Sequence, residues 1–196
     1  MNNNYNKSEK LAKIIRVTTV APFNIFIAMT LIFLIKPNFI GGILPYILSV
    51  LFLTIFPLLA YPCQKFVPYY RDKGRNGQRN FSIVMSVIGY LLGLTFSLIF
   101  KENNFIIVLY LTYLLSGISI AVFSKIIKFK ASGHTCGLIG PLALLFYVFN
   151  FYALIGLIIV PFVFWASIKL KRHTFPQLIA GSFIPIVIFT LLINFL

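Results

Sequence analysis

The chain has 196 residues, of which 60% are hydrophobic and only 10% are charged. Soluble domains usually carry about 25% charged residues, so this composition excludes an ordinary soluble protein. The formal net charge is +14, but the cations lie between long apolar runs and do not form the continuous basic surface of a nucleic-acid-binding protein. With a mean hydropathy of +0.96, the chain is predicted to be a polytopic membrane protein embedded in the lipid bilayer, without a nucleic-acid partner.

Uncharged runs predict where the chain crosses the membrane. They cover residues 17–35, 37–64, 80–100, 103–124, 131–168 and 173–196. One helix needs about 20 residues to cross the hydrocarbon core. The 131–168 run has 38 residues, enough for two short helices with a turn near Asn150. We therefore predict an all-α transmembrane helix bundle of about seven spans, or six if one run is read differently. Residues 1–16 are predicted to be a polar tail, and residues 17–196 a single membrane-embedded domain.

Most cations lie on one side of these predicted spans. If seven spans alternate in direction, 15 of the 17 Lys and Arg share the side of the N-terminus, and only Lys36 and Lys101 lie opposite. Loops on the cytoplasmic side of membrane proteins are enriched in Lys and Arg. We therefore expect a multi-pass protein of the cell membrane whose N-terminus and loops at 65–79, 125–130 and 169–173 are cytoplasmic.

Acidic residues and cysteines are too few for a dedicated metal site. Asp72 and Glu102 are the only carboxylates beyond the N-terminal tail, and Cys63 and Cys136 form no CxxC pair. Zinc takes three or four N, S or O protein ligands, and hard cations take several oxygens. The sequence predicts neither a metal nor another cofactor.

Three polar segments share the predicted cytoplasmic side and hold both histidines of the chain. They are residues 71–80, 130–134 and 169–177, with His134 in the second and His173 in the third. Arginine binds phosphate oxygens, helix N-terminal N–H groups bind anions, and histidine attacks phosphorus or transfers protons near neutral pH. This combination favours phosphate chemistry, although membrane topology alone also requires cations beside spans.

The order of these segments resembles the type 2 phosphatidic acid phosphatase superfamily of membrane lipid phosphatases, whose motifs read K-x6-R-P, P-S-G-H and S-R-x5-H-x3-D. The 132–134 segment reads Ser-Gly-His, with Ala131 in place of the proline, and 173–181 is similar to the end of the third motif. The resemblance implies that His173 is a nucleophile that forms a phosphohistidine and that His134 is the acid for the leaving alcohol. With the neighbouring cations, the phosphate-binding candidates are Arg79, Arg75, Lys73, Ser132, Gly133, Lys130 and Arg172.

The chain departs from the third motif at two positions. Gln177 stands where the family has the aspartate that orients the nucleophilic imidazole, and Ser167 stands where it has an arginine. Glutamine accepts a hydrogen bond from the imidazole but does not stabilise an imidazolium by charge. Gln177 and the nearby acid Asp72 are therefore both candidates for orienting the nucleophile, and Lys169, Lys171 or Arg172 for replacing the arginine.

The sequence thus predicts metal-independent hydrolysis of a lipid phosphate monoester or diphosphate, such as phosphatidate, phosphatidylglycerol phosphate or a prenyl diphosphate. The alternative is a catalytically inactive relative that binds anionic lipid through its basic loops. A small transporter would place ionisable groups at mid-membrane, and the predicted spans carry no charge there.

Overall fold

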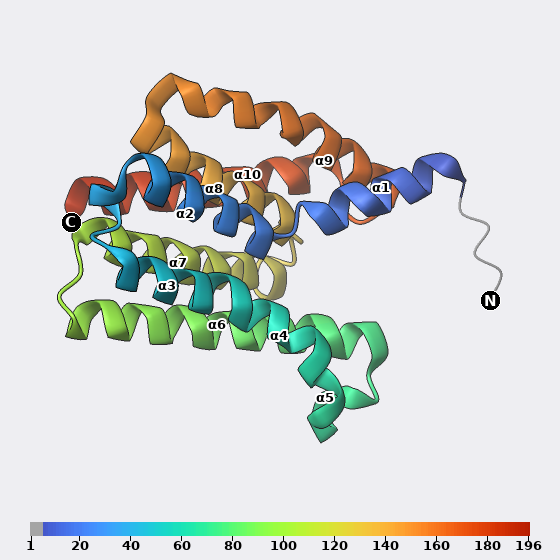
Figure 1. The fold of residues 1–196 in the computed structure, drawn as a ribbon. Coiled ribbons are helices and arrows are strands. Elements are labelled where there is room, and N and C mark those ends of the chain that lie inside the picture. Colours follow the sequence, from blue (N-terminus) through green and yellow to red (C-terminus); the bar gives the residue numbers. More distant parts are fainter. Residues whose placement is uncertain (1–5) are drawn as a thin grey trace.

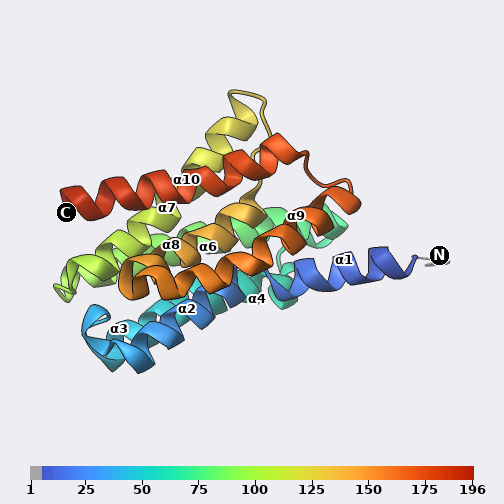
Figure 2. The same cartoon turned by 90° about the horizontal axis from the view of Figure 1, so that it is seen from above.

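A computed structural model describes residues 6–196, apart from the side chains of Arg75 and Asn76, and it contains helices and no strand over this range. The α-helices are α1 (Lys7–Thr18), α2 (Ala21–Ile35), α3 (Ile43–Val50), α4 (Phe56–Cys63), α5 (Pro68–Arg71), α6 (Gly74–Ile99), α7 (Asn104–Lys125), α8 (Gly133–Phe149), α9 (Ile159–Lys169) and α10 (Phe175–Phe195). Tighter or wider helical segments join some of them: η1 (Pro37–Phe39), η2 (Leu51–Ile55), η3 (Gln64–Phe66) and η4 (Asn150–Ile158). Figures 1 and 2 show the long helices side by side in one bundle, which confirms the predicted helical class.

Fewer than seven stretches are long and apolar enough to cross a membrane. In the described part of the chain five qualify, and a sixth does if the bent pair α1–α2 is counted as one span. The five are Ile43–Phe66, Gly77–Ile99, Asn104–Lys125, Gly133–Lys169 and Phe175–Phe195. The prediction of seven exceeded this number because α2 has only 15 residues, and because α8, η4 and α9 together form the single apolar stretch Gly133–Lys169.

The first predicted span is broken near its beginning. α1 and α2 meet at an angle of 51°, and Pro22 occupies the first turn of α2. Proline has no N–H to donate to the preceding turn, so the hydrogen-bond pattern of α1 cannot continue through Pro22. The chain therefore bends at 19–20, and most of the segment predicted as a polar tail is the separate helix α1, which packs along α9.

The predicted turn near Asn150 is present. α8 ends at Phe149, and Asn150 has a φ of 54°, in the left-handed region that asparagine tolerates better than most residues. The chain then runs back through η4 and α9 beside α8 (Figure 1).

The core lies where α2, α7, α8 and α10 meet. Its fully buried side chains include Ile25, Ile32, Leu109 and Leu144. Many large apolar side chains point outward instead, as expected for helices surrounded by lipid. The α7–α8 and α9–α10 connections lie towards the α1 end of the bundle, whereas the α2–α3 and α6–α7 connections lie at the opposite end (Figure 1). This arrangement brings the segments 130–134 and 169–177 together.

Candidate functional site

His173 lies in the loop between α9 and α10, and Gln177 on the first turn of α10 holds its ring. The Nδ1 atom of His173 is 3.3 Å from Oε1 of Gln177. The same oxygen accepts a hydrogen bond from the backbone N–H of Thr174 at 3.1 Å, as part of a capping box that begins α10. Because this oxygen is an acceptor, Nδ1 of His173 must carry the proton, which leaves the lone pair of a neutral ring on Nε2.

His134 is the second residue of α8 and is half-buried. Its Nε2 atom lies 3.0 Å from Oγ1 of Thr19, at the bend between α1 and α2. The Thr19 hydroxyl donates to the carbonyl of Ile15 at 2.6 Å, so it accepts a hydrogen bond from Nε2 of His134. His134 is therefore fixed to the first helix of the chain, and its Nδ1 atom is not used in this contact.

The beginning of α8 is fastened to α10, which sets where the two histidines lie relative to each other. The N–H of Ser132 donates to the carbonyl of Gln177 at 2.9 Å, and Oγ1 of Thr135 donates to the carbonyl of Leu178 at 3.1 Å. Gly181 allows this approach, since a Cβ there would overlap the Ser132 carbonyl and the Thr135 hydroxyl. The second and third predicted motifs thus meet through backbone and hydroxyl hydrogen bonds.

Ser132 and Gly133 differ in how they face the site. The Ser132 side chain is fully buried and caps α8 by accepting a hydrogen bond from the Thr135 N–H at 3.3 Å. Gly133 is exposed at the first position of α8, where helix geometry leaves N–H groups without a partner inside the helix. In this arrangement the backbone at Gly133, and not the hydroxyl of Ser132, presents a donor to an anion.

Arg16 supplies a guanidinium group that the sequence analysis assigned to the tail. Its Nη1 atom donates to Oγ of Ser167 on α9. Its charge also acts on the imidazoles of both His134 and His173. The signal in the sequence is the i, i+4 spacing of Ala12 and Arg16, which places the guanidinium group on the buried face of α1, opposite the exposed Leu11, Ile14 and Val17.

Positive charge and burial keep His173 neutral. Burial lowers the pKa of His173 below its ordinary value of 6.5, and the charges of Arg16 and Lys130 lower it further. Hydrogen bonds with Gln177 and with the Lys130 backbone raise this pKa and offset part of the effect. A neutral imidazole retains the lone pair that a nucleophile requires.

Two more predicted phosphate-binding residues lie beside these histidines. Lys130 lies three residues before the start of α8, with an exposed side chain whose charge reaches His173. Arg172 is exposed, and its backbone N–H donates to the Ser167 carbonyl at 3.0 Å. Both cations lie at the rim of the histidine cluster, which we define as Arg16, His134, Ser167, His173 and Gln177.

The first predicted motif is not brought to this cluster by any contact among the described residues. Asp72 is exposed and pairs with Arg71 at 3.2 Å, and the Lys73 ammonium lies 3.3 Å from the centre of the Tyr69 ring. Arg79 is exposed on the first turns of α6, and the predicted Arg75 side chain lies outside the described part of the structure. Figure 1 shows α5 and the start of α6 on the far side of α2 from α9.

Within the described residues, no group of three or more His, Cys, Asp or Glu side chains is placed to hold a metal ion. Comparisons of the chain with protein-family models, with curated proteins and with solved structures gave no significant match.

Proposed function

We propose that this protein hydrolyses a lipid phosphate monoester or diphosphate at the histidine cluster, without a metal, through a phosphohistidine. The observation that carries the proposal is the meeting of His134, His173 and Arg16 from three separate parts of the chain. Two imidazoles and a guanidinium group provide a nucleophile, a proton donor and a phosphate-binding group.

Each group has a role in the proposed reaction. Nε2 of His173 attacks phosphorus while Gln177 holds Nδ1–H, and the bond from phosphorus to the leaving alcohol oxygen breaks. His134 takes up a proton at Nδ1, the ring nitrogen that Thr19 does not hold, and gives it to that oxygen. Water then attacks the phosphohistidine, loses a proton to His134, and releases inorganic phosphate and free His173. Arg16 and the exposed N–H of Gly133 bind the phosphate oxygens, and Lys130 and Arg172 raise the local concentration of anionic headgroups.

The charge distribution supports a cytoplasmic site in the cell membrane. Lys130, Lys169, Lys171 and Arg172 flank the cluster, whereas Lys36 and Lys101 belong to connections at the opposite end of the bundle. Under the positive-inside rule the cluster faces the cytoplasm. Its substrate would then be a lipid of the inner leaflet.

Phosphate release by the purified protein in detergent tests this proposal. Phosphatidate, phosphatidylglycerol phosphate and an undecaprenyl diphosphate are offered in the presence of EDTA. We expect release from at least one lipid, a loss of at least a hundredfold in His173→Ala, and wild-type release in the matched cation variant Lys101→Ala. Release that EDTA abolishes, or that His173→Ala retains, contradicts the mechanism.

A lipid-binding protein without activity is the second candidate, and Gln177 is the observation that favours it. Its side-chain oxygen already completes the capping box of α10, and it carries no charge to stabilise an imidazolium. This candidate predicts binding to vesicles with anionic lipid and no phosphate release from any of the three lipids.

A further inference from the structure

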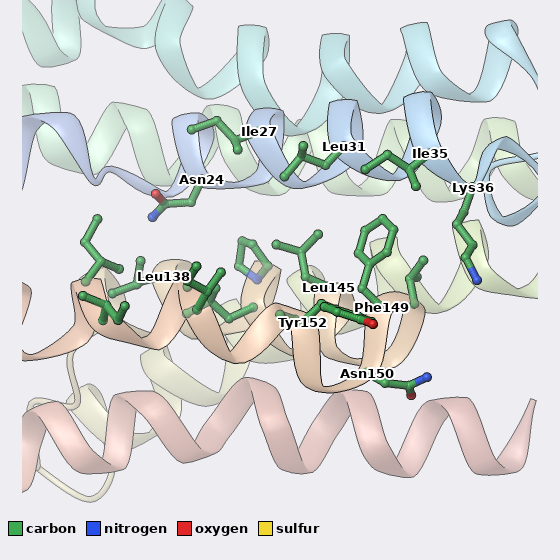
Figure 3. A pocket seen from close by; sticks show the side chains of 18 of the residues that line it. Asn24, Ile27, Leu31, Ile35, Lys36, Leu138, Leu145, Phe149, Asn150 and Tyr152 are labelled. Carbon is green, nitrogen blue, oxygen red and sulfur yellow. The ribbon is translucent and has the colours of Figure 1, made fainter.

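A hydrophobic groove runs along α2, between this helix and the η4–α9 segment, with α8 as its floor. Its volume is about 980 Å³. Ile27, Leu31 and Ile35 line it from α2, and Leu138 and Leu145 from α8, as Figure 3 shows. Leu31 is 39% exposed and Phe162 on α9 is 55% exposed, so the groove opens sideways to the surroundings of the bundle. In a membrane those surroundings are hydrocarbon chains.

One end of the groove adjoins the histidine cluster. Asn24 lines this end, and its Nδ2 atom donates to the carbonyl of Thr19 at 2.9 Å. Thr19 in turn holds the His134 ring through its hydroxyl. Leu138, one helical turn after His134, lines the same end (Figure 3). A molecule in the groove can therefore extend its polar end to the cluster.

The other end of the groove is polar. Lys36, Asn150 and Tyr152 lie there (Figure 3). Asn24 and Lys36 are 12 residues apart along α2, which corresponds to about 18 Å at 1.5 Å per helical residue. This length is close to that of one extended acyl chain, which reaches across about half of the roughly 30 Å hydrocarbon core. A longer apolar chain would have to pass the Lys36 ammonium and the polar groups beside it.

We propose that this groove binds an acyl chain of a phospholipid whose phosphate lies at the histidine cluster. The inference rests on the proposed function and narrows its substrate class. An extended acyl chain matches the length of the groove, whereas a long polyprenyl chain does not. The substrate is accordingly an acyl-glycerol phosphate of the inner leaflet and not a polyprenyl diphosphate.

Photolabelling tests the groove without requiring turnover. The probe is a phosphonate analogue of phosphatidate with a diazirine midway along one acyl chain, added to the full-length protein in nanodiscs. We expect the label on peptides from α2 and from η4–α9. Leu31→Trp fills the groove and should lower labelling at least fivefold. Leu34→Trp, on the same helix but outside the groove and 70% exposed, should label within twofold of the wild type.

The outcomes separate this inference from the hydrolysis itself. Even labelling of the lipid-facing helices would contradict acyl-chain binding in the groove. Labelling that Leu31→Trp leaves unchanged would contradict it as well. Ile27→Trp replaces Leu31→Trp if the latter loses its monodisperse peak in size-exclusion chromatography. Undecaprenyl phosphate should compete at least tenfold more weakly than phosphatidate, and equal competition overturns the length limit. Groove-specific labelling without phosphate release from any lipid would support acyl-chain binding in the groove and contradict the proposed hydrolysis.

Discussion

Replacing Gly181 with alanine should separate α8 from α10 and damage the histidine cluster. The added Cβ would overlap the Ser132 carbonyl and the Thr135 hydroxyl and lie 2.9 Å from the Ser132 nitrogen. Two of these three atoms are backbone, so they do not move aside by a rotamer change. Overpacking of this kind costs about 1–3 kcal/mol. A lost hydrogen bond between Ser132 or Thr135 and α10 adds about 0.5–1.5 kcal/mol.

The expected loss for Gly181→Ala is therefore about 3 kcal/mol, or a fall in Tm of about 6–12 °C for a chain of this size. Thermal unfolding in detergent measures it, and phosphate release should fall in parallel because the Ser132–His134 segment shifts away from His173. Gly117→Ala is the matched control, since nothing lies within 4 Å of a Cβ at this position of α7. Alanine there should be neutral or stabilise the helix by up to about 1 kcal/mol. If Gly181→Ala unfolds within 2 °C of the wild type and keeps its activity, the proposed α8–α10 junction is wrong.

Four further predictions concern the cluster and the first predicted motif. Arg16→Lys should reduce kcat/KM for phosphate release about tenfold or more, since lysine lacks the bidentate geometry of guanidinium, and wild-type activity would remove Arg16 from phosphate binding. The acid limb of the pH–rate profile should lie below pH 6.5, because the pKa of His173 is lowered and the nucleophile must be neutral. The same shift makes folding stability fall as pH drops below 6.5, where the unfolded chain takes up a proton before the folded one does. Gln177→Glu should move the acid limb to higher pH, because a carboxylate stabilises the imidazolium, and an unmoved limb would argue against the contact between residues 173 and 177. Asp72→Asn should leave turnover unchanged, since this exposed carboxylate pairs with its neighbour in sequence, and a large loss would bring the α5–α6 segment back into the site.

Composition and hydropathy were sufficient to predict the helical membrane bundle, because the bilayer constrains every span in the same way. The turn at Asn150 was predictable for a similar reason, since 38 uncharged residues are too many for one crossing. Local sequence patterns also identified the segments around His134 and His173 as parts of the candidate site. The bend at Pro22 and the short helices on either side of Asn150, however, reduce the number of full-length spans below what run lengths suggested.

The partner of each polar residue was harder to predict. Arg16 and Ser167 are separated by 151 positions, and no local pattern in a single sequence indicates such a pair. The basic segment at 71–80 has the composition of a phosphate-binding loop, but α5 and the first turns of α6 pack against one another and against η3, away from the cluster. Residue type predicted the kind of chemistry, whereas tertiary packing determined which cations take part.

The contact between Arg16 and Ser167 also bears on how the protein matures. It joins the first helix to the penultimate one, and His173 follows six residues after Ser167. During synthesis, α1 leaves the ribosome long before α9 and α10 do. Arg16 is therefore synthesised well before Ser167, the residue it contacts in the folded protein. A chain arrested before α9 would contain Arg16 and His134 but neither Ser167 nor His173, and it would lack the nucleophile of the proposed reaction. Completion of the cluster is thus coupled to insertion of the last helical pair.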